Sequence, residues 1–166
     1  MAGYPSLPAA VGGGGKADEL SVLAACFSLF WGAFLAATIL PGASELMLIG
    51  LIAKGIADPW LLVLVAGTGN TLGSVVNWLC GRFMLRYQER RWFPVKPKQL
   101  EAATRFFNRY GVWTLLFAWS PLGGDALTVI AGTLRVPLVP FVVLVAIGKF
   151  ARYVVVAGAT LAWPGL

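Results

Sequence analysis

Long apolar tracts make up most of this chain, and short polar segments separate them. The tracts cover residues 20–52, 59–79, 111–134 and 137–163. Each approaches or exceeds the ~20 residues that a helix needs to cross the hydrocarbon core of a bilayer. Only 12% of the residues are charged, whereas a soluble domain carries about 25%. The pattern predicts an all-α integral membrane protein, with one membrane domain over residues 20–166 after a flexible tail over residues 1–19.

Two polar breaks interrupt the first and third tracts. Each break has a proline, one or two glycines and a carboxylate four positions after the proline: Pro41, Gly42 and Glu45 in the first, and Pro121, Gly123, Gly124 and Asp125 in the second. Proline removes a backbone donor and ends a helix, and an ionisable side chain in hydrocarbon costs roughly 2.5–3.5 kcal/mol on insertion scales. The apolar arm after the first break, residues 46–53, covers only about 12 Å as a helix. We therefore expect each broken tract to fold as a re-entrant hairpin.

The two halves of the chain have the same order of elements. Residues 20–81 and residues 111–163 are each predicted to form a broken hairpin followed by a full span, with residues 82–110 connecting them. The first break recurs as the second after 80 positions, and Asn70 corresponds to Lys149 after 79. Because one span separates the hairpins, they should enter the membrane from opposite faces. This predicts an inverted repeat whose breaks meet near the midplane, where secondary transporters place their substrate sites.

The excess positive charge is confined to the connection between the halves. Residues 82–109 hold eight of the 13 basic residues and two of the seven acidic ones, and the rest of the chain is balanced at five of each. By the positive-inside rule this connection faces the cytoplasm. Its flanking membrane segments argue against nucleic-acid binding, the other interpretation of a basic run, and favour attraction to anionic lipid headgroups.

Residues 98–110 within this connection are expected to form an amphipathic helix that lies in the membrane interface. Its apolar face would hold Leu100, Ala103, Phe106, Phe107 and Tyr110, and its basic face Lys98, Arg105 and Arg109.

Four ionisable side chains lie deep in the apolar tracts: Glu45, Asp125, Lys149 and Arg152. In a functional interpretation they line a hydrated cavity at the midplane, where Lys149 and Arg152, three positions apart on one helix face, bind one phosphate. In a structural interpretation they form ion pairs that close the fold. Asn70 is a further candidate for the cavity lining, although Asn70 and Asn77, on one face of the same helix, could instead supply hydrogen bonds between helices.

The chain contains no histidine. This removes His-based acid–base catalysis and most metal sites, and Ser44 and Ser120 beside the breaks have no base partner other than a carboxylate. Cys26 and Cys80 lie in apolar tracts without metal-ligand spacing. We therefore expect no enzyme activity, no cofactor and no metal.

Seven short motifs follow one another along the chain: Leu40-Pro41-Gly42-x-Ser44-Glu45, Gly69-Asn70-Thr71-Leu72-Gly73, Gly81-Arg82-Phe83, Phe107-x-Arg109-Tyr110-Gly111, Trp119-x-Pro121-x-x-Gly124-Asp125, Ala131-Gly132 and Gly148-Lys149-x-x-Arg152-Tyr153. In order and spacing, from about residue 20 to residue 163, this set resembles the YqaA branch of the DedA family. That family is part of the VTT-domain (SNARE-associated Golgi protein) superfamily.

The resemblance implies two facing re-entrant hairpins in a multi-pass protein of the bacterial inner membrane. It also implies a link to membrane homeostasis and to movement of phospholipid or lipid-linked phosphate between leaflets, which in some members depends on the proton gradient and on membrane acids and arginines. Many DedA proteins carry arginines three residues before and after the second-hairpin proline, where this chain has Ala118 and Gly124. Lys149 and Arg152 would then have to supply the positive charge.

The buried charges and the resemblance together favour a lipid or small-anion transporter and leave proton coupling open. The resemblance implies phospholipid or lipid-linked phosphate as the substrate. Glu45 and Asp125 would carry protons or set the charge of the cavity, and Lys149 and Arg152 would bind phosphate. The alternative is a non-transporting membrane scaffold or assembly factor that binds lipid or a partner through its basic amphipathic helix. The expected partners are membrane lipids with anionic headgroups, and the sequence leaves a homo-oligomer open.

Overall fold

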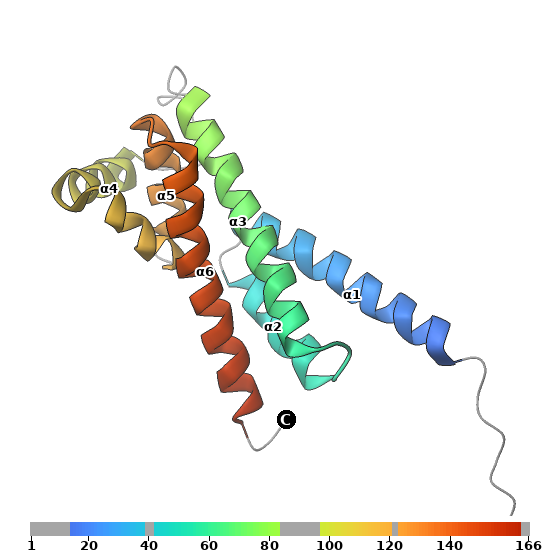
Figure 1. The fold of residues 1–166 in the computed structure, drawn as a ribbon. Helices are drawn as coiled ribbons and strands as arrows, with labels where there is room; N and C mark the ends of the chain where they lie inside the picture. Colours follow the sequence, from blue (N-terminus) through green and yellow to red (C-terminus); the bar gives the residue numbers. More distant parts are fainter. Residues whose placement is uncertain (1–13, 39–41, 84–96, 121–122, 164–166) are drawn as a thin grey trace, which may run out of the picture.

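The computed structural model describes residues 14–38, 42–83, 97–120 and 123–163, and these residues form helices and no strand. In chain order the elements are α1 (Gly14–Ala36), α2 (Ala43–Ala53), α3 (Pro59–Phe83), α4 (Pro97–Tyr110), the 3₁₀-helix η2 (Gly111–Trp119), α5 (Gly124–Thr133) and α6 (Leu138–Leu161). The all-helical fold is as predicted, and the expected full spans correspond closely to α3 and α6 (Figure 1).

Three helices are long and apolar enough to cross a membrane: α1 over Asp18–Ala36, α3 and α6. By contrast, α2 has 11 residues and α5 has 10, which correspond to about 17 and 15 Å of helix against a hydrocarbon core of ~30 Å. The chain is therefore a helical membrane protein in which two short helices accompany the long ones.

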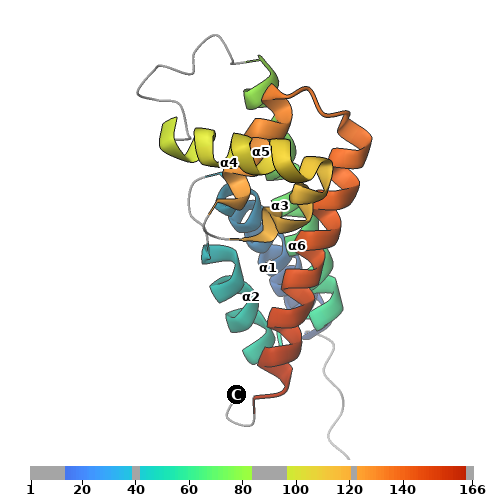
Figure 2. The same ribbon diagram turned by 90° about the vertical axis from the view of Figure 1, so that its left-hand side faces the viewer.

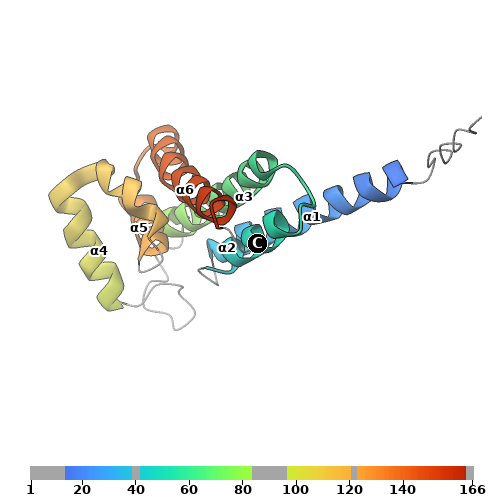
Figure 3. The ribbon, with the colours of Figure 1, turned by 90° about the horizontal axis from the view of Figure 1, so that it is seen from below.

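Helix α4 lies across the bundle and packs on α5 and η2 (Figure 2). Seen from below, α4 and the N-terminal part of α1 project from opposite sides of the molecule (Figure 3). The bounds of α4 agree with the expected amphipathic helix. Phe107 is buried, and Arg105 and Arg109 are exposed as expected, but Tyr110 is 51% exposed instead of packed. The side chains of Lys98, Leu100, Ala103 and Phe106 lie outside the described part of the structure.

The two halves of the chain pack on each other reciprocally. Within the halves, α1 packs on α3 and η2 packs on α6. Between the halves, α3 packs on α5, whereas α6 packs on α2. Each short helix is therefore covered by the long helix of the opposite half.

The core consists of two apolar clusters, and both α3 and α6 contribute to each of them. The start of α3 lies in the same cluster as the end of α6, and the end of α3 in the same cluster as the start of α6. Leu62, near the start of α3, and Ala157, near the end of α6, belong to one cluster. Trp78, near the end of α3, and Phe141, near the start of α6, belong to the other. Polar residues of both helices therefore fall between the two clusters.

Glycines allow α3 and α5 to pack backbone to backbone. A Cβ atom at Gly81 of α3 would lie 1.9 Å from the Val129 carbonyl oxygen, and one at Gly132 of α5 would lie 2.0 Å from the Trp78 carbonyl oxygen. Gly69 and Gly73 of α3 contact α1 in the same way, at the carbonyl oxygens of Phe30 and Phe34. Small residues at these positions bring membrane helices into close contact.

We expect Gly81→Ala and Gly132→Ala each to lower the stability of the protein by about 1–3 kcal/mol, because the added methyl forces α3 and α5 apart. The measurement is the thermal unfolding midpoint in detergent. Gly158→Ala in α6 is the matched control, since a Cβ there meets nothing within 4 Å. A stability loss at Gly158 equal to that at Gly81 would contradict the packing argument.

Two elements differ from the sequence-based expectation. Helix α1 begins at Gly14, so residues 14–19 are helical although the tail was expected to extend to residue 19; Lys, Ala and Glu in this stretch favour helix. The arm before the second break, residues 111–119, is a 3₁₀-helix, whereas the arm before the first break is an α-helix. Pro41, Pro121 and residues 1–13 lie outside the described residues.

Candidate functional site

Two glycines at the breaks start the short helices. Gly42 precedes α2 with φ 96°, and Gly123 precedes α5 with φ 138°. These positive φ values are accessible to glycine at little steric cost. Each short helix then carries one carboxylate in its first turn, Glu45 in α2 and Asp125 in α5. The positive end of a helix dipole favours a negative charge at that place.

A small polar cavity lies where the two breaks meet. It measures about 10 Å³, close to the room that one water molecule needs. The residues predicted for the site all line it: Glu45, Asn70, Asp125, Lys149 and Arg152, together with Gly42, Ser44, Ser120 and three alanines (Ala36, Ala37 and Ala118). The structure therefore brings together polar residues from α2, α3, α5 and α6.

Lys149 of α6 connects to the cavity wall through a buried hydrogen-bond chain. Its ammonium donates to both the backbone carbonyl oxygen (3.2 Å) and the side-chain oxygen of Asn70 in α3. The Asn70 amide donates to the Tyr153 hydroxyl at 2.7 Å, which in turn donates to Ser44 Oγ of α2 at 2.8 Å. All four side chains are buried. The chain of contacts fixes α6 against α3 and α2.

Arg152, one turn further along α6, bridges the two breaks. Its Nη2 lies 2.7 Å from Oε1 of Glu45, and its Nη1 donates to the Trp119 carbonyl oxygen at 2.8 Å, at the end of η2. Within the described residues, neither oxygen of Glu45 accepts a hydrogen bond of good geometry. The ion pair is thus close but incompletely hydrogen-bonded, and such a buried pair adds little net stability.

Asp125 is placed differently from Glu45. Its side chain is half-buried in the cavity, and the described residues place no cationic nitrogen within ion-pair distance of it. Lys149 and Arg152 therefore diverge in this state, Lys149 toward Asn70 and Arg152 toward Glu45, although both still line the same cavity.

Asn77 does not line the cavity. Its amide donates to the Ala37 carbonyl oxygen at 2.8 Å, just after α1. Of the two roles that the sequence left open, Asn77 therefore has the interhelical one. Trp78 makes a similar contact that the sequence analysis did not predict: its indole N–H donates to the Val136 carbonyl oxygen at 3.1 Å.

Tyr153 is the site residue that sequence reasoning missed. It is 1% exposed and lies between Asn70 and Ser44. Its position four residues after Lys149 places both on one face of α6, which is the signal that could have indicated it. Among the described residues, no three His, Cys, Asp or Glu side chains are grouped so as to hold a metal ion.

A model of the VTT domain matches residues 19–161 of the chain. The chain is 44% identical over 135 residues to the inner membrane protein YqaA of Escherichia coli (strain K12), covering 81% of this chain and 90% of the relative; YqaA of Shigella flexneri matches to the same extent. An uncharacterized protein of Haemophilus influenzae is 34% identical over 146 residues, covering 84% of this chain and 88% of the relative. No solved structure matches.

The helices and the charged cavity between them define a multi-pass membrane protein with an ionisable interior site. The chain belongs to the VTT-domain family, and its similarity to YqaA confirms the resemblance to the DedA family seen in the sequence motifs. Both YqaA relatives are inner membrane proteins, which agrees with the predicted location of this chain in the bacterial inner membrane.

Proposed function

We propose that this protein moves phospholipid or lipid-linked phosphate between the leaflets of the bacterial inner membrane, in a proton-coupled cycle. The observation that carries the proposal is the convergence of two acids and two bases, from both halves of the chain, on one cavity between the breaks. Ionisable side chains within membrane segments are costly, and by default they indicate a functional site such as a transport pathway or a proton relay.

The electrostatics of the cavity favour an anion. Lys149 and Arg152 balance Glu45 and Asp125 in formal charge. The first turns of α2 and α5 add the positive ends of two helix dipoles, equivalent to roughly +0.5 charge each. In transporters with broken helices, such half-helix N-termini point at anionic substrate groups. A phosphate suits an ammonium and a guanidinium together, because its oxygens accept several charge-assisted hydrogen bonds.

The finer architecture that we propose is an inverted repeat of two re-entrant hairpins. The shortness of α2 and α5, the glycine at the start of each, and the reciprocal packing of α3 on α5 and α6 on α2 support it. Residues 82–110 face the cytoplasm in this arrangement, as their excess of basic residues requires.

Transport requires the cavity to open, since about 10 Å³ holds no phosphate group. Opening separates Arg152 from Glu45 and frees the guanidinium for the substrate phosphate. In the proposed cycle, Glu45 carries a proton while Arg152 binds the phosphate. Asp125 offers a second proton site beside the same cations.

The test is lipid movement in proteoliposomes, with labelled phospholipid and a polyprenyl phosphate, with and without a pH gradient. We expect Asp125→Asn to reduce movement to the level of empty vesicles, because the change removes a proton site without changing side-chain size. Asp58→Asn is the matched control: Asp58 caps α3 through the N–H groups of Trp60 and Leu61, and asparagine caps a helix equally well.

Wild-type rates in Asp125→Asn would refute the assignment of Asp125. No movement by folded wild-type protein would refute transport and favour the scaffold alternative. The exposed Arg105 and Arg109 on α4, a helix that lies across the bundle, would then be the first residues to test by charge reversal.

A further inference from the structure

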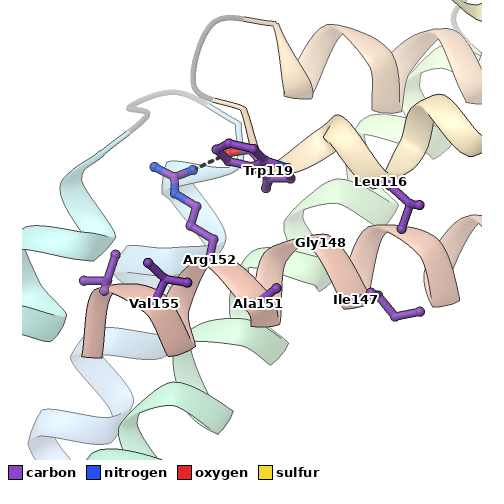
Figure 4. A pocket seen from close by; sticks show the side chains of 8 residues that line it. Leu116, Trp119, Ile147, Gly148, Ala151, Arg152 and Val155 are labelled. Atoms are coloured by element: carbon purple, nitrogen blue, oxygen red, sulfur yellow. Dashed lines mark hydrogen bonds between the residues drawn. The ribbon is translucent and has the colours of Figure 1, made fainter. Parts of the chain in front are cut away.

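A second, larger hollow opens on the outer side of α6. It measures about 410 Å³ and runs between η2 and α6 (Figure 4). Pockets that bind small organic ligands start at about 300 Å³, so this groove is large enough for a ligand, unlike the polar cavity. Its main lining side chains are Leu116, Trp119, Ile147, Ala151, Arg152 and Val155.

The lining combines an apolar wall with one charge. Among the described residues that line the groove, Arg152 is the only charged one. In Figure 4 its guanidinium lies toward one end, near Trp119, while Leu116 and Ile147 lie toward the other. From Ile147 to Val155, α6 advances about 12 Å. A ligand that fits is therefore an amphiphile with an anionic group at one end and a hydrocarbon chain.

Arg152 belongs to both hollows. It lines the polar cavity, where it pairs with Glu45, and it lines the apolar groove. A guanidinium has five N–H donors, more than its contacts with Glu45 and the Trp119 carbonyl oxygen use. A phosphate in the groove could therefore bind Arg152 before the ion pair with Glu45 opens.

Arg152 also lies closer to the middle of α6 than to either end. A lipid bound there would hold its phosphate deep in the membrane, far from the interface where headgroups normally reside. The groove is therefore suited to a lipid in passage.

We propose that the groove between η2 and α6 binds a phospholipid, with one acyl chain along Leu116, Ile147 and Ala151 and its phosphate on Arg152. The proposal rests on the proposed function and adds to it the place where the lipid enters the site. Two observations favour a phospholipid as the ligand: Arg152 complements the charge of its phosphate, and the groove is exposed on α6.

The test measures equilibrium binding to purified protein in detergent, without any gradient. The probes are fluorescent phosphatidylglycerol, the matching diacylglycerol and inorganic phosphate as a competitor. We expect phosphatidylglycerol to bind about tenfold more tightly than diacylglycerol, the effect of one charge-assisted contact. Inorganic phosphate should not displace it, because phosphate alone gains nothing from the apolar wall.

Ala151→Trp fills the middle of the groove and should weaken phosphatidylglycerol binding at least about tenfold, since the acyl chain loses its buried surface. Ala159→Trp is the matched control: Ala159 is also exposed on α6 but does not line the groove. Arg152→Gln should remove the preference for phosphatidylglycerol over diacylglycerol. If Ala151→Trp does not fold, Ile147→Trp replaces it, with the exposed Val143→Trp as its control.

Equal binding by Ala151→Trp and Ala159→Trp, or equal affinity for the two lipids, would overturn the proposal. Displacement by inorganic phosphate would indicate a free-anion site instead, and loss of an oligomer in Ala151→Trp without loss of lipid would indicate a contact between copies. Lipid movement that is unaffected by Ala151→Trp would refute the groove and leave transport standing. Binding without movement would refute transport and leave the groove standing.

Discussion

Replacing Glu45 by glutamine is expected to abolish lipid movement while the protein still folds and inserts. Glu45 is 9% exposed and pairs with Nη2 of Arg152 at 2.7 Å. Glutamine keeps the size of the side chain but can neither accept a proton nor hold the guanidinium as an ion pair. Because Arg152 also donates to the Trp119 carbonyl oxygen, we expect a stability loss of only about 1–3 kcal/mol.

The measurement is movement of labelled lipid in proteoliposomes beside thermal unfolding of the same preparation. Glu101→Gln, on an exposed position of α4, provides the same chemical change outside the cavity and should behave as wild type. The double variant Glu45→Gln with Arg152→Gln should recover stability, since it leaves no unpaired charge, but not movement. Wild-type movement in Glu45→Gln would show that the ion pair is purely structural.

Replacing Lys149 by methionine is expected to be the most destabilising single change at the cavity. Lys149 is 4% exposed, and its ammonium is bound to two oxygens of Asn70. Removing it takes the donor from the buried side-chain oxygen of Asn70, whereas the Asn70 carbonyl oxygen keeps the Ser74 hydroxyl as a donor. It also leaves the carboxylates of the cavity with one cation fewer. Removing one partner of a buried hydrogen bond costs about 1–3 kcal/mol, and more where the lost partner is charged.

Thermal and denaturant unfolding in detergent would measure this loss. Lys54→Met is the control, since Lys54 is exposed at the end of α2. Adding Asp125→Asn to Lys149→Met should restore part of the lost stability, because it removes a carboxylate that the ammonium would otherwise balance. A Lys149→Met variant as stable as wild type would contradict the role of Lys149 as the link between α6 and α3.

Much of this arrangement was predictable because it depends on local chemistry. Pro41, Gly42 and Gly123 mark the breaks, since proline and glycine limit where a helix can continue. The ionisable residues were recognisable because charge is expensive in apolar sequence. Glu45 and Asp125 hold equivalent positions in the two halves, as do Asn70 and Lys149, which indicated that these residues would meet. All of them line one cavity, together with Arg152.

The remaining features depend on partners far away in the sequence. Asn77 could be assigned to helix packing only when the Ala37 carbonyl oxygen was seen beside it. The 3₁₀ conformation of residues 111–119 has no local signal, because the same apolar residues would suit an α-helix. Trp119 is the last residue of this helix. Its carbonyl oxygen accepts a hydrogen bond from Arg152, which is a tertiary contact. The sequence predicted that Lys149 and Arg152 bind one phosphate together, whereas in the structure Lys149 donates to Asn70. This contact also could not be predicted from nearby residues.

The reciprocal packing of the halves has a consequence for biosynthesis. Lys149 follows its partner Asn70 by 79 residues, and Arg152 follows Glu45 by still more. During translation, α2 and α3 therefore leave the ribosome well before α6. The polar groups of α2 and α3 bind Lys149 and Arg152 of α6 only after that. Non-local pairings of this kind slow folding and expose incomplete intermediates. In the nascent chain, Glu45 and Asn70 therefore lack their contacts with Arg152 and Lys149 until α6 has been synthesised.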